Sequence, residues 1–243
     1  MRRLAVSLLV GCWAGGLRLA PARADIISVE SEIRIGREAA GEVERQLPLS
    51  RDPLLQSRVE RVGRRLAMVS DRPELPFEFH VIEAREVNAF ALPGGFTYVY
   101  RGLLQAIPND DALAFILGHE ITHAVRRHAV KQLRKNTVVE ILSLPLRRVL
   151  GGGSDWLRLI VQQMYSRDDE SEADHLGLEL CVKAGFSPDG GAQAMDTLLK
   201  MYGKGDSQIL VLLQDHPATE RRMKKLKEQI GRASCRERVY VLV

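Results

Sequence analysis

Residues 118–123 of this 243-residue chain read Gly118-His119-Glu120-Ile121-Thr122-His123. We place them in a helix that starts at Pro108-Asn109-Asp110 and runs through Leu133, because apolar residues recur there at helical spacing. Positions four apart lie on the same face of a helix, so the imidazoles of His119 and His123 converge while Glu120 sits one step round. Two neutral imidazoles beside a carboxylate suit a catalytic zinc ion. The stretch therefore predicts a metal centre.

The remaining protein ligand has to come from another element. A metzincin carries Gly and His at the positions occupied here by Arg126 and Ala129, so this helix does not supply it. His128 would lie about 140° from His123 on a continuous helix, and we expect it to point elsewhere. Glu170 is the best candidate. Glu140 is the fallback, although it lacks an acidic companion four residues later.

Glu170 lies in an acidic segment that opens a predicted helix over 167–184. Asp174 follows four residues later on the same helix face. We expect Glu170 to bind the metal and Asp174 to accept a hydrogen bond from the second ring nitrogen of a ligand histidine. Such a partner fixes the orientation of the ring, and His119 is the histidine we expect it to hold. Glu172 lies on the other side of the helix and is expected to be solvated.

The rest of the chain predicts a mostly helical α+β domain with one small sheet. Alternating apolar residues predict three short strands, which we expect to form an antiparallel sheet. Asp52-Pro53 supplies an N-cap followed by proline at the first helical position. The expected helices cover 29–46, 52–69, 189–201 and 217–229, and the expected strands cover 77–83, 87–92 and 96–101.

Residues 1–24 read as an export signal. Arg2 and Arg3 precede an apolar stretch, and Ala22-Arg23-Ala24 matches the small-x-small rule for cleavage before Asp25. We expect the mature protein to reside in the periplasm. A competing interpretation takes Cys12 as a lipidated residue that anchors the protein peripherally to a membrane.

Residues 231–243 resemble one reading frame of a sequencing adapter, and we interpret them as an assembly artefact that follows a domain over 25–230. The formal net charge of +4 comes from the two ends, since 28 basic and 30 acidic residues remain without them. This slightly acidic domain gives no support for nucleic-acid binding. Cys181 is the cysteine that the domain retains, and we expect it in the core.

Four sequence features, in this order along the chain, resemble peptidase family M48. They are Asn88-Ala89-Phe90-Ala91-Leu92-Pro93-Gly94-Gly95, His119-Glu120-x-x-His123, Glu170-x-x-x-Asp174, and His216-Pro217. This is the gluzincin family that includes HtpX, Oma and the CAAX prenyl proteases. The likeness is strongest to exported bacterial members of the BepA and LoiP type, and it covers roughly residues 28–229.

The resemblance implies one zinc ion per chain, bound by two histidines and one glutamate. His119, His123 and Glu170 are the implied ligands, Glu120 the implied general base, and Asp174 the implied support of the ligand shell. The fold that it implies is a mostly helical gluzincin domain whose small sheet has an edge strand beside the zinc cleft.

Asn88, Ala89 and Phe90 belong to that implied edge strand, which would hold an extended peptide by main-chain hydrogen bonds. The alternative for Asn88 and Phe90 is a turn-forming amide and a core aromatic. His216 is implied to be either a latch over the metal or a donor to the oxyanion, and Arg222 to assist at the substrate. Asp215 precedes His216 where relatives often carry a hydroxyl residue, so the pairing of the latch stays open.

The function that the resemblance implies is zinc-dependent endopeptidase activity on unfolded or misassembled exported and outer-membrane proteins. Polypeptide substrates and the outer-membrane assembly machinery are the implied partners. The alternative is a chaperone-like factor that binds outer-membrane protein intermediates with little proteolysis. A third candidate is a metal-free interaction lipoprotein.

Overall fold

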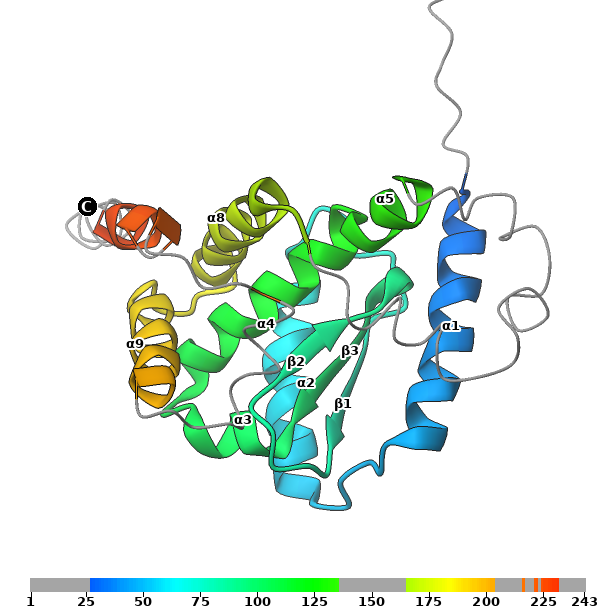
Figure 1. Ribbon diagram of the computed structural model, residues 1–243, viewed down its shortest axis with the longest axis horizontal. Helices are drawn as coiled ribbons and strands as arrows, with labels where there is room; N and C mark the ends of the chain where they lie inside the picture. The colour runs from blue at the N-terminus through cyan, green and yellow to red at the C-terminus, as the bar shows by residue number, and fades with distance from the viewer. Residues whose placement is uncertain (1–26, 136–164, 204–215, 217–220, 223, 232–243) are drawn as a thin grey trace, which may run out of the picture.

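The computed structural model describes residues 27–135, 165–203, 216, 221–222 and 224–231 (Figure 1). Glu140, the expected signal and the tail at 232–243 lie outside the described residues. The elements are α1 (Val29–Gln46), α2 (Pro53–Ala67), β1 (Glu78–Ile82), β2 (Ala89–Ala91), the 3-10 turn η1 (Pro93–Gly95), β3 (Phe96–Tyr100), α3 (Arg101–Ala106), α4 (Asp110–Val125), α5 (His128–Lys135), α8 (Arg167–Lys183) and α9 (Asp189–Gly203). Residues 221–222 and 224–231 are also helical.

Polar residues just ahead of the helices determine where they begin. The carboxylate of Asp52 accepts hydrogen bonds from the backbone N–H groups of Leu54 and Leu55, and Pro53 occupies the first turn of α2. Asn109 caps α4 in the same way, with its amide oxygen 2.9 Å from the backbone nitrogen of Ala112. These starts confirm the two helix N-termini that the sequence predicts.

The sheet is mixed, so the expectation of an antiparallel sheet was wrong for one pair of strands. β2 pairs antiparallel with β3, but β1 pairs parallel with β3, with Glu78 opposite Phe96. The strand order is β1-β3-β2, because the turn at Pro93–Gly95 folds β3 back against β2 and inserts it beside β1. β2 thus lies at an edge of the sheet, and the α+β fold class is confirmed.

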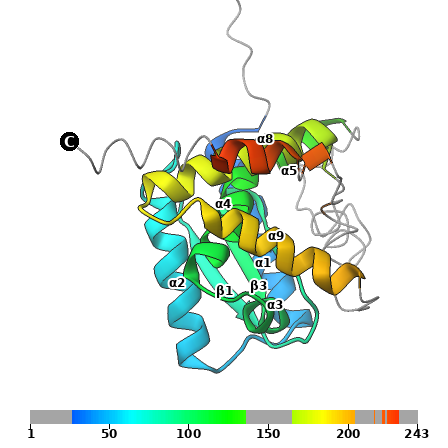
Figure 2. The ribbon, with the colours of Figure 1, turned by 90° about the vertical axis from the view of Figure 1, so that its left-hand side faces the viewer.

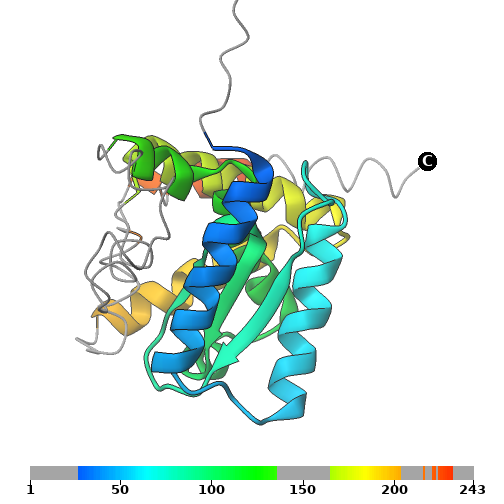
Figure 3. The same ribbon diagram turned by 90° about the vertical axis from the view of Figure 1, so that its right-hand side faces the viewer.

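The sheet lies between two helical layers, with α1 on one face and α2 and α4 on the other (Figure 3). Ile35 and Val43 of α1 pack against the aromatic side of the sheet, where Tyr98 lies. On the opposite face, apolar residues of α2 and α4 form a second and larger core that includes Cys181. The expected core position of this cysteine is therefore confirmed.

α4 is the central helix of the fold, and its residues 112–124 are all buried. It packs against α2 and β2, while α8 and α9 cover it from the side away from the sheet (Figure 2). A helix that is apolar all round requires such complete coverage. The catalytic motif predicted from the sequence therefore lies within the core, where its polar side chains have been removed from bulk water.

The predicted continuation of this helix through Leu133 was wrong. α4 ends at Val125, and Arg127 adopts a left-handed conformation with φ of 58° before α5 begins at His128. A non-glycine residue in this conformation needs support from its surroundings. Arg127 has this support, since its Nε lies 3.0 Å from a carboxylate oxygen of Glu32 on α1.

Among the helices that the structure describes, none is long and apolar enough to cross a membrane.

Glu32 is fully buried and joins three parts of the fold. It accepts hydrogen bonds from both terminal nitrogens of Arg72 at 3.1 and 3.0 Å, and it also pairs with Arg127. We expect Glu32→Gln to lower the free energy of unfolding by about 3 kcal/mol, because it removes the buried negative charge that the partly buried side chains of Arg72 and Arg127 share. Urea unfolding measures this loss. Glu38→Gln on the exposed side of α1 is the control and should change it by less than about 0.5 kcal/mol, and equal effects would contradict the assignment.

Candidate metal centre

α4 presents two imidazoles to a single point in the interior. The Nε2 atoms of His119 and His123 lie 3.0 Å apart, and both side chains are almost fully buried. Their spacing of four residues places them on the same face of the helix, as the sequence predicts. Burial lowers the pKa of His123 well below its usual range, so its ring is neutral and able to bind a metal.

α8 brings two carboxylates to the same point. A carboxylate oxygen of Glu170 lies 3.4 Å from His123 Nε2, and the other lies 3.7 Å from His119 Nε2. Asp174 Oδ1 lies 3.1 Å from Nδ1 of His119. The structure therefore brings together the candidate ligands and the acidic companion that the sequence singled out, and His119 is the histidine that Asp174 contacts.

Two glycines allow α4 and α8 to approach this closely. A Cβ atom added to Gly177 would lie 2.8 Å from the backbone nitrogen of His119, and one added to Gly118 would lie 2.8 Å from the carbonyl oxygen of Gly177. Both distances are shorter than a normal contact. Sequence reasoning missed this pair, although a glycine on each of two predicted helices is a signal of close helix packing.

Gly177→Ala is expected to push α8 away from α4 and to destabilise the protein by about 1–3 kcal/mol, because the added methyl group meets backbone atoms that cannot rotate away. Thermal unfolding measures the change. Gly41→Ala is the matched control in helix α1, where the nearest atom is the end of the Arg45 side chain at 3.7 Å. The control should be neutral or stabilising, since alanine favours helix. A tolerated Gly177→Ala would contradict the close approach.

The hydrogen-bond partners determine which ring nitrogen of His119 carries the proton. Although burial acts to raise the pKa of Asp174, hydrogen bonds from Arg222 and His119 lower it to about 2, so it is a carboxylate. A carboxylate only accepts hydrogen bonds, so Nδ1 of His119 donates to Asp174. Nε2 then carries a lone pair that points at His123. Such an arrangement is favourable when a cation lies between the rings.

His216 is the fourth group at this point. Its Nδ1 lies 3.2 Å from His119 Nε2 and 3.0 Å from a carboxylate oxygen of Glu170, and its Nε2 lies 3.6 Å from Glu120. Burial would lower the pKa of His216, but the carboxylates of Glu120 and Glu170 outweigh burial and raise it to about 9, so this histidine binds a metal ion only when the ion displaces the proton from Nδ1. The same histidine also helps to hold the pKa of Glu170 well below its usual range, against the effect of burial.

The four donors have the spacing of a tetrahedral zinc site. Zinc binds histidine nitrogen at about 2.0–2.1 Å, so donors at the corners of a tetrahedron lie roughly 3.3 Å apart. The donor atoms of His119, His123, Glu170 and His216 that contact one another lie 3.0 to 3.7 Å apart. His119, His123, Glu170 and His216 are also buried together with their ligand atoms within 4.8 Å of one another. The residues therefore fit a zinc ion.

Arg222 lies behind the candidate ligands. Its Nε and Nη2 donate to the two oxygens of Asp174 at 2.7 and 2.8 Å, and its Nη1 contacts Glu170. The side chain is 8% exposed, so a single buried positive charge stabilises both carboxylates. The sequence predicted that Arg222 assists at the substrate. In the structure its guanidinium group contacts the acidic side chains of the centre.

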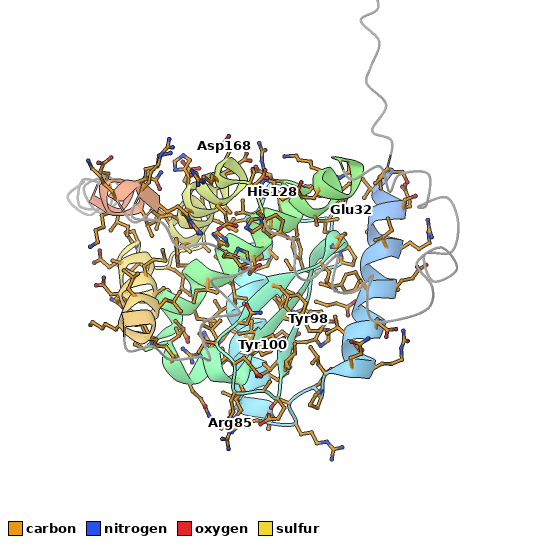
Figure 4. The ribbon with its side chains drawn as sticks, in the orientation of Figure 1. Glu32, Arg85, Tyr98, Tyr100, His128 and Asp168 are labelled. Atoms are coloured by element: carbon orange, nitrogen blue, oxygen red, sulfur yellow. The ribbon has the colours of Figure 1, made fainter. Side chains whose placement is uncertain are left out.

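His128 lies outside the group of four candidate ligands, as expected, but it contacts the rear of the His123 ring, which the sequence did not predict. The prediction assumed a continuous helix, whereas the left-handed Arg127 turns the chain and brings His128 Nδ1 to 2.9 Å from His123 Nδ1. Figure 4 labels His128 where α4 gives way to α5, at the same end of the molecule as Glu32 and Asp168. Glu172 is not simply solvated either, since its Oε2 lies 3.1 Å from His128 Nε2.

Tyr165 is a further residue that sequence reasoning missed. Its ring stacks on His123 with the ring centres 3.9 Å apart and the planes inclined by 22°, and it also lies 5.6 Å from the ring of His216. The residue directly precedes Ser166, the N-cap of α8. The sequence contained one signal for this residue, because Tyr165 is an aromatic residue next to the cap of the helix that carries Glu170.

Asn88, Ala89 and Phe90, the residues expected to bind substrate along the edge strand, are buried. Ala89 and Phe90 pair with β3, and the ring of Phe90 stacks on Tyr98 at 5.2 Å within the core beneath α1. The side chain of Phe90 therefore occupies the core aromatic position that the sequence allowed as its alternative. Asn88 is 1% exposed and its side-chain oxygen accepts from the backbone N–H of Ala89. Ala91 lines the same small crevice as His123, so the end of β2 lies beside the centre.

Comparisons with known proteins agree with a metal centre of this kind. The profile of peptidase family M48 matches residues 53–230. The chain belongs to this family. Among its curated relatives, the mitochondrial metalloendopeptidase OMA1 of Schizosaccharomyces pombe is 31% identical over 222 residues, which cover 86% of this chain and 64% of that protein. The beta-barrel assembly-enhancing protease of Escherichia coli strain K12 is 28% identical over 218 residues, which cover 81% of this chain and 43% of that protein.

The M48 match includes every residue of the candidate centre. The mitochondrial metalloendopeptidase OMA1 of Saccharomyces cerevisiae is a further relative, 29% identical over 168 residues that cover 66% of this chain and 49% of that protein. The chain thus spans between 43 and 64% of the length of these three relatives. The resemblance to M48 drawn from four short motifs is confirmed.

Proposed function

We propose that this chain is a zinc endopeptidase of the gluzincin type. The observation that carries the proposal is the convergence of His119, His123 and Glu170 on one buried point with the spacing of a tetrahedral metal site. His119 and His123 come from one helix and Glu170 from another, and the backbones of these helices touch. Two histidines and a glutamate are a common ligand set of catalytic zinc.

The chemistry needs a base next to the metal. Zinc bound at this point would polarise the scissile carbonyl and lower the pKa of water. Glu120 is buried with its Oε1 3.6 Å from Nε2 of His216, so its carboxylate lies beside the ligands and takes the proton of the attacking water. The same carboxyl group then delivers that proton to the leaving amine.

His216 holds the proposed enzyme closed. Its Nδ1 faces the ligand atoms of His119 and Glu170, where it would take the fourth position around the metal, while its Nε2 faces the base Glu120. A catalytic zinc site keeps one position open for water and substrate, whereas a site with four protein ligands is closed. Of the two roles that the sequence left open, this geometry favours the latch.

The proposed substrates are unfolded or misassembled exported proteins, including those of the outer membrane. Support comes from the name of the Escherichia coli relative, a beta-barrel assembly-enhancing protease. β2 lies at an edge of the sheet next to α4, where an extended chain can add main-chain hydrogen bonds. We propose a periplasmic location, with attachment through Cys12 as the membrane-anchored alternative and the outer-membrane assembly machinery as partner.

The test uses casein with wild type and His216→Ala, each measured with zinc, after removal of zinc by a chelator, and after zinc is restored. We expect casein cleavage by His216→Ala that disappears with the chelator and returns with zinc. Cleavage that persists in the chelator would contradict the metal chemistry. If neither protein cleaves casein but both suppress the aggregation of an unfolded outer-membrane protein, the chaperone-like alternative replaces this proposal.

A further inference from the structure

His128 lies behind His123, on the side of the His123 ring that faces away from the proposed metal, and the two rings contact each other through one pair of nitrogens. Nδ1 of His123 lies 2.9 Å from Nδ1 of His128, with the rings inclined by 75°. A hydrogen bond between two such nitrogens needs one proton, so one ring donates and the other accepts. The direction of this hydrogen bond determines which nitrogen of His123 is left with a lone pair.

That direction decides whether His123 is able to bind a metal. If His123 donates from Nδ1, its Nε2 carries a lone pair and faces His119 Nε2 at 3.0 Å, where the proposed zinc lies. If His128 donates instead, the proton of a neutral His123 sits on Nε2 and points into the metal position. The second arrangement blocks metal binding.

Carboxylates behind His128 favour the first arrangement. Nε2 of His128 lies 3.1 Å from Glu172 Oε2 and 3.5 Å from Asp169 Oδ1. Carboxylates accept hydrogen bonds and do not donate them, so they hold the proton of His128 on Nε2. Arg126 donates to the other oxygen of Glu172 at 2.7 Å, which keeps this residue in its ionised form.

We propose that His128 and Glu172 are positioning residues that hold His123 in the tautomer required for metal binding. The hydrogen bonds run from His123 Nδ1 to His128 Nδ1 and from His128 Nε2 to Glu172. This series of hydrogen bonds supports His123 as the direct contact with Asp174 supports His119, but one additional imidazole, that of His128, lies between the ligand and the carboxylate. The inference rests on the proposed zinc site, and it assigns to α5 and to the outer part of α8 a role in metal affinity.

His128, Asp169 and Glu172 also have the composition of a small metal site. The shared proton argues against that use. A cation on His128 Nε2 would displace its proton to Nδ1, and His128 would then donate to His123 and force the proton of His123 onto Nε2. Two metal ions would each require a proton on the Nδ1 atom of their own histidine, and the contact between the two Nδ1 atoms accommodates only one proton. A second bound zinc ion is therefore an outcome that overturns the proposal.

The first experiment measures the zinc dissociation constant of the full chain by competition with a chromogenic chelator at neutral pH. We expect His128→Phe to weaken zinc binding by about 10- to 100-fold, because His123 loses its acceptor. His128→Asn should restore most of the affinity, since its side-chain oxygen replaces Nδ1 as the acceptor. Glu172→Gln should cause an intermediate loss, because an amide is able to donate to His128 and reverse the chain.

His175→Phe is the matched control, a histidine on α8 that is half-exposed and lies outside this chain of hydrogen bonds. It should leave zinc affinity unchanged. Equal zinc affinity in wild type and His128→Phe would overturn the positioning role alone, as would equal losses in the Phe and Asn variants. Two zinc ions in wild type and one in His128→Phe would also overturn it. A wild-type chain that binds no zinc overturns the proposed function as well.

The second experiment reads the tautomer directly and does not depend on a variant. In the zinc-loaded wild-type protein, long-range ¹H–¹⁵N correlation NMR of labelled histidines distinguishes a proton on Nδ1 from one on Nε2. We expect His123 with its proton on Nδ1 and His128 with its proton on Nε2. A proton on Nδ1 of His128 would overturn the proposal even if every variant loses zinc.

Discussion

Glu120→Gln is expected to lower kcat/KM for peptide hydrolysis by about 100- to 10,000-fold. The substitution keeps the size of the side chain but removes the carboxylate that takes the proton from water. We expect the variant to fold and to retain one zinc ion per chain, because Glu120 is not among the proposed ligands. Proteins with and without Glu120→Gln are compared in the His216→Ala background, where the fourth metal position is free for water. The readout is cleavage of an unfolded protein.

Glu179→Gln is the control for this substitution, since Glu179 lies on α8 and is half-exposed. It should leave kcat/KM unchanged. Full activity of the Glu120→Gln protein would contradict the assigned base. A loss of zinc along with activity would instead make Glu120 a structural part of the ligand shell.

His216→Ala is expected to raise kcat/KM by about tenfold or more over wild type. A tenfold gain corresponds to a closed state that is favoured by about 1.4 kcal/mol, and several short contacts to the centre support at least that preference. The gain arises because removal of the imidazole frees the fourth metal position and the carboxylate of Glu120. Initial rates with equal zinc content in both proteins measure it.

His175→Ala removes an exposed histidine of α8 and serves as the control, with no expected gain. A His216→Ala protein that is less active than wild type would contradict the latch. That result would favour the second role suggested by the sequence, in which His216 donates to the oxyanion during catalysis.

The sequence predicted the parts of the centre that depend on local geometry. His119 and His123 lie together because helical spacing requires it, and Glu170 and Asp174 share a face of α8 for the same reason. The capping residues Asp52 and Asn109 likewise act within a few residues of their own positions. Such features follow from short-range stereochemistry, which a single sequence contains.

The features that the sequence did not predict depend on contacts between distant segments. The left-handed Arg127 ends α4, and its support comes from Glu32, far away on α1. This turn brings His128 behind His123, against the expectation from a continuous helix. The parallel pairing of β1 with β3 also depends on which strand the chain inserts between the others, and hydrophobic alternation does not specify that choice.

Zinc K-edge X-ray absorption of the wild-type chain and of His216→Ala is the most direct test of the central claim, that one buried zinc is held by His119, His123 and Glu170 and closed by His216. We predict four protein ligands in wild type, three of them imidazoles, at about 2.0–2.1 Å. His216→Ala should lose one imidazole and gain a water oxygen. The same number of imidazoles in both proteins, or a wild-type chain without zinc, would contradict the account.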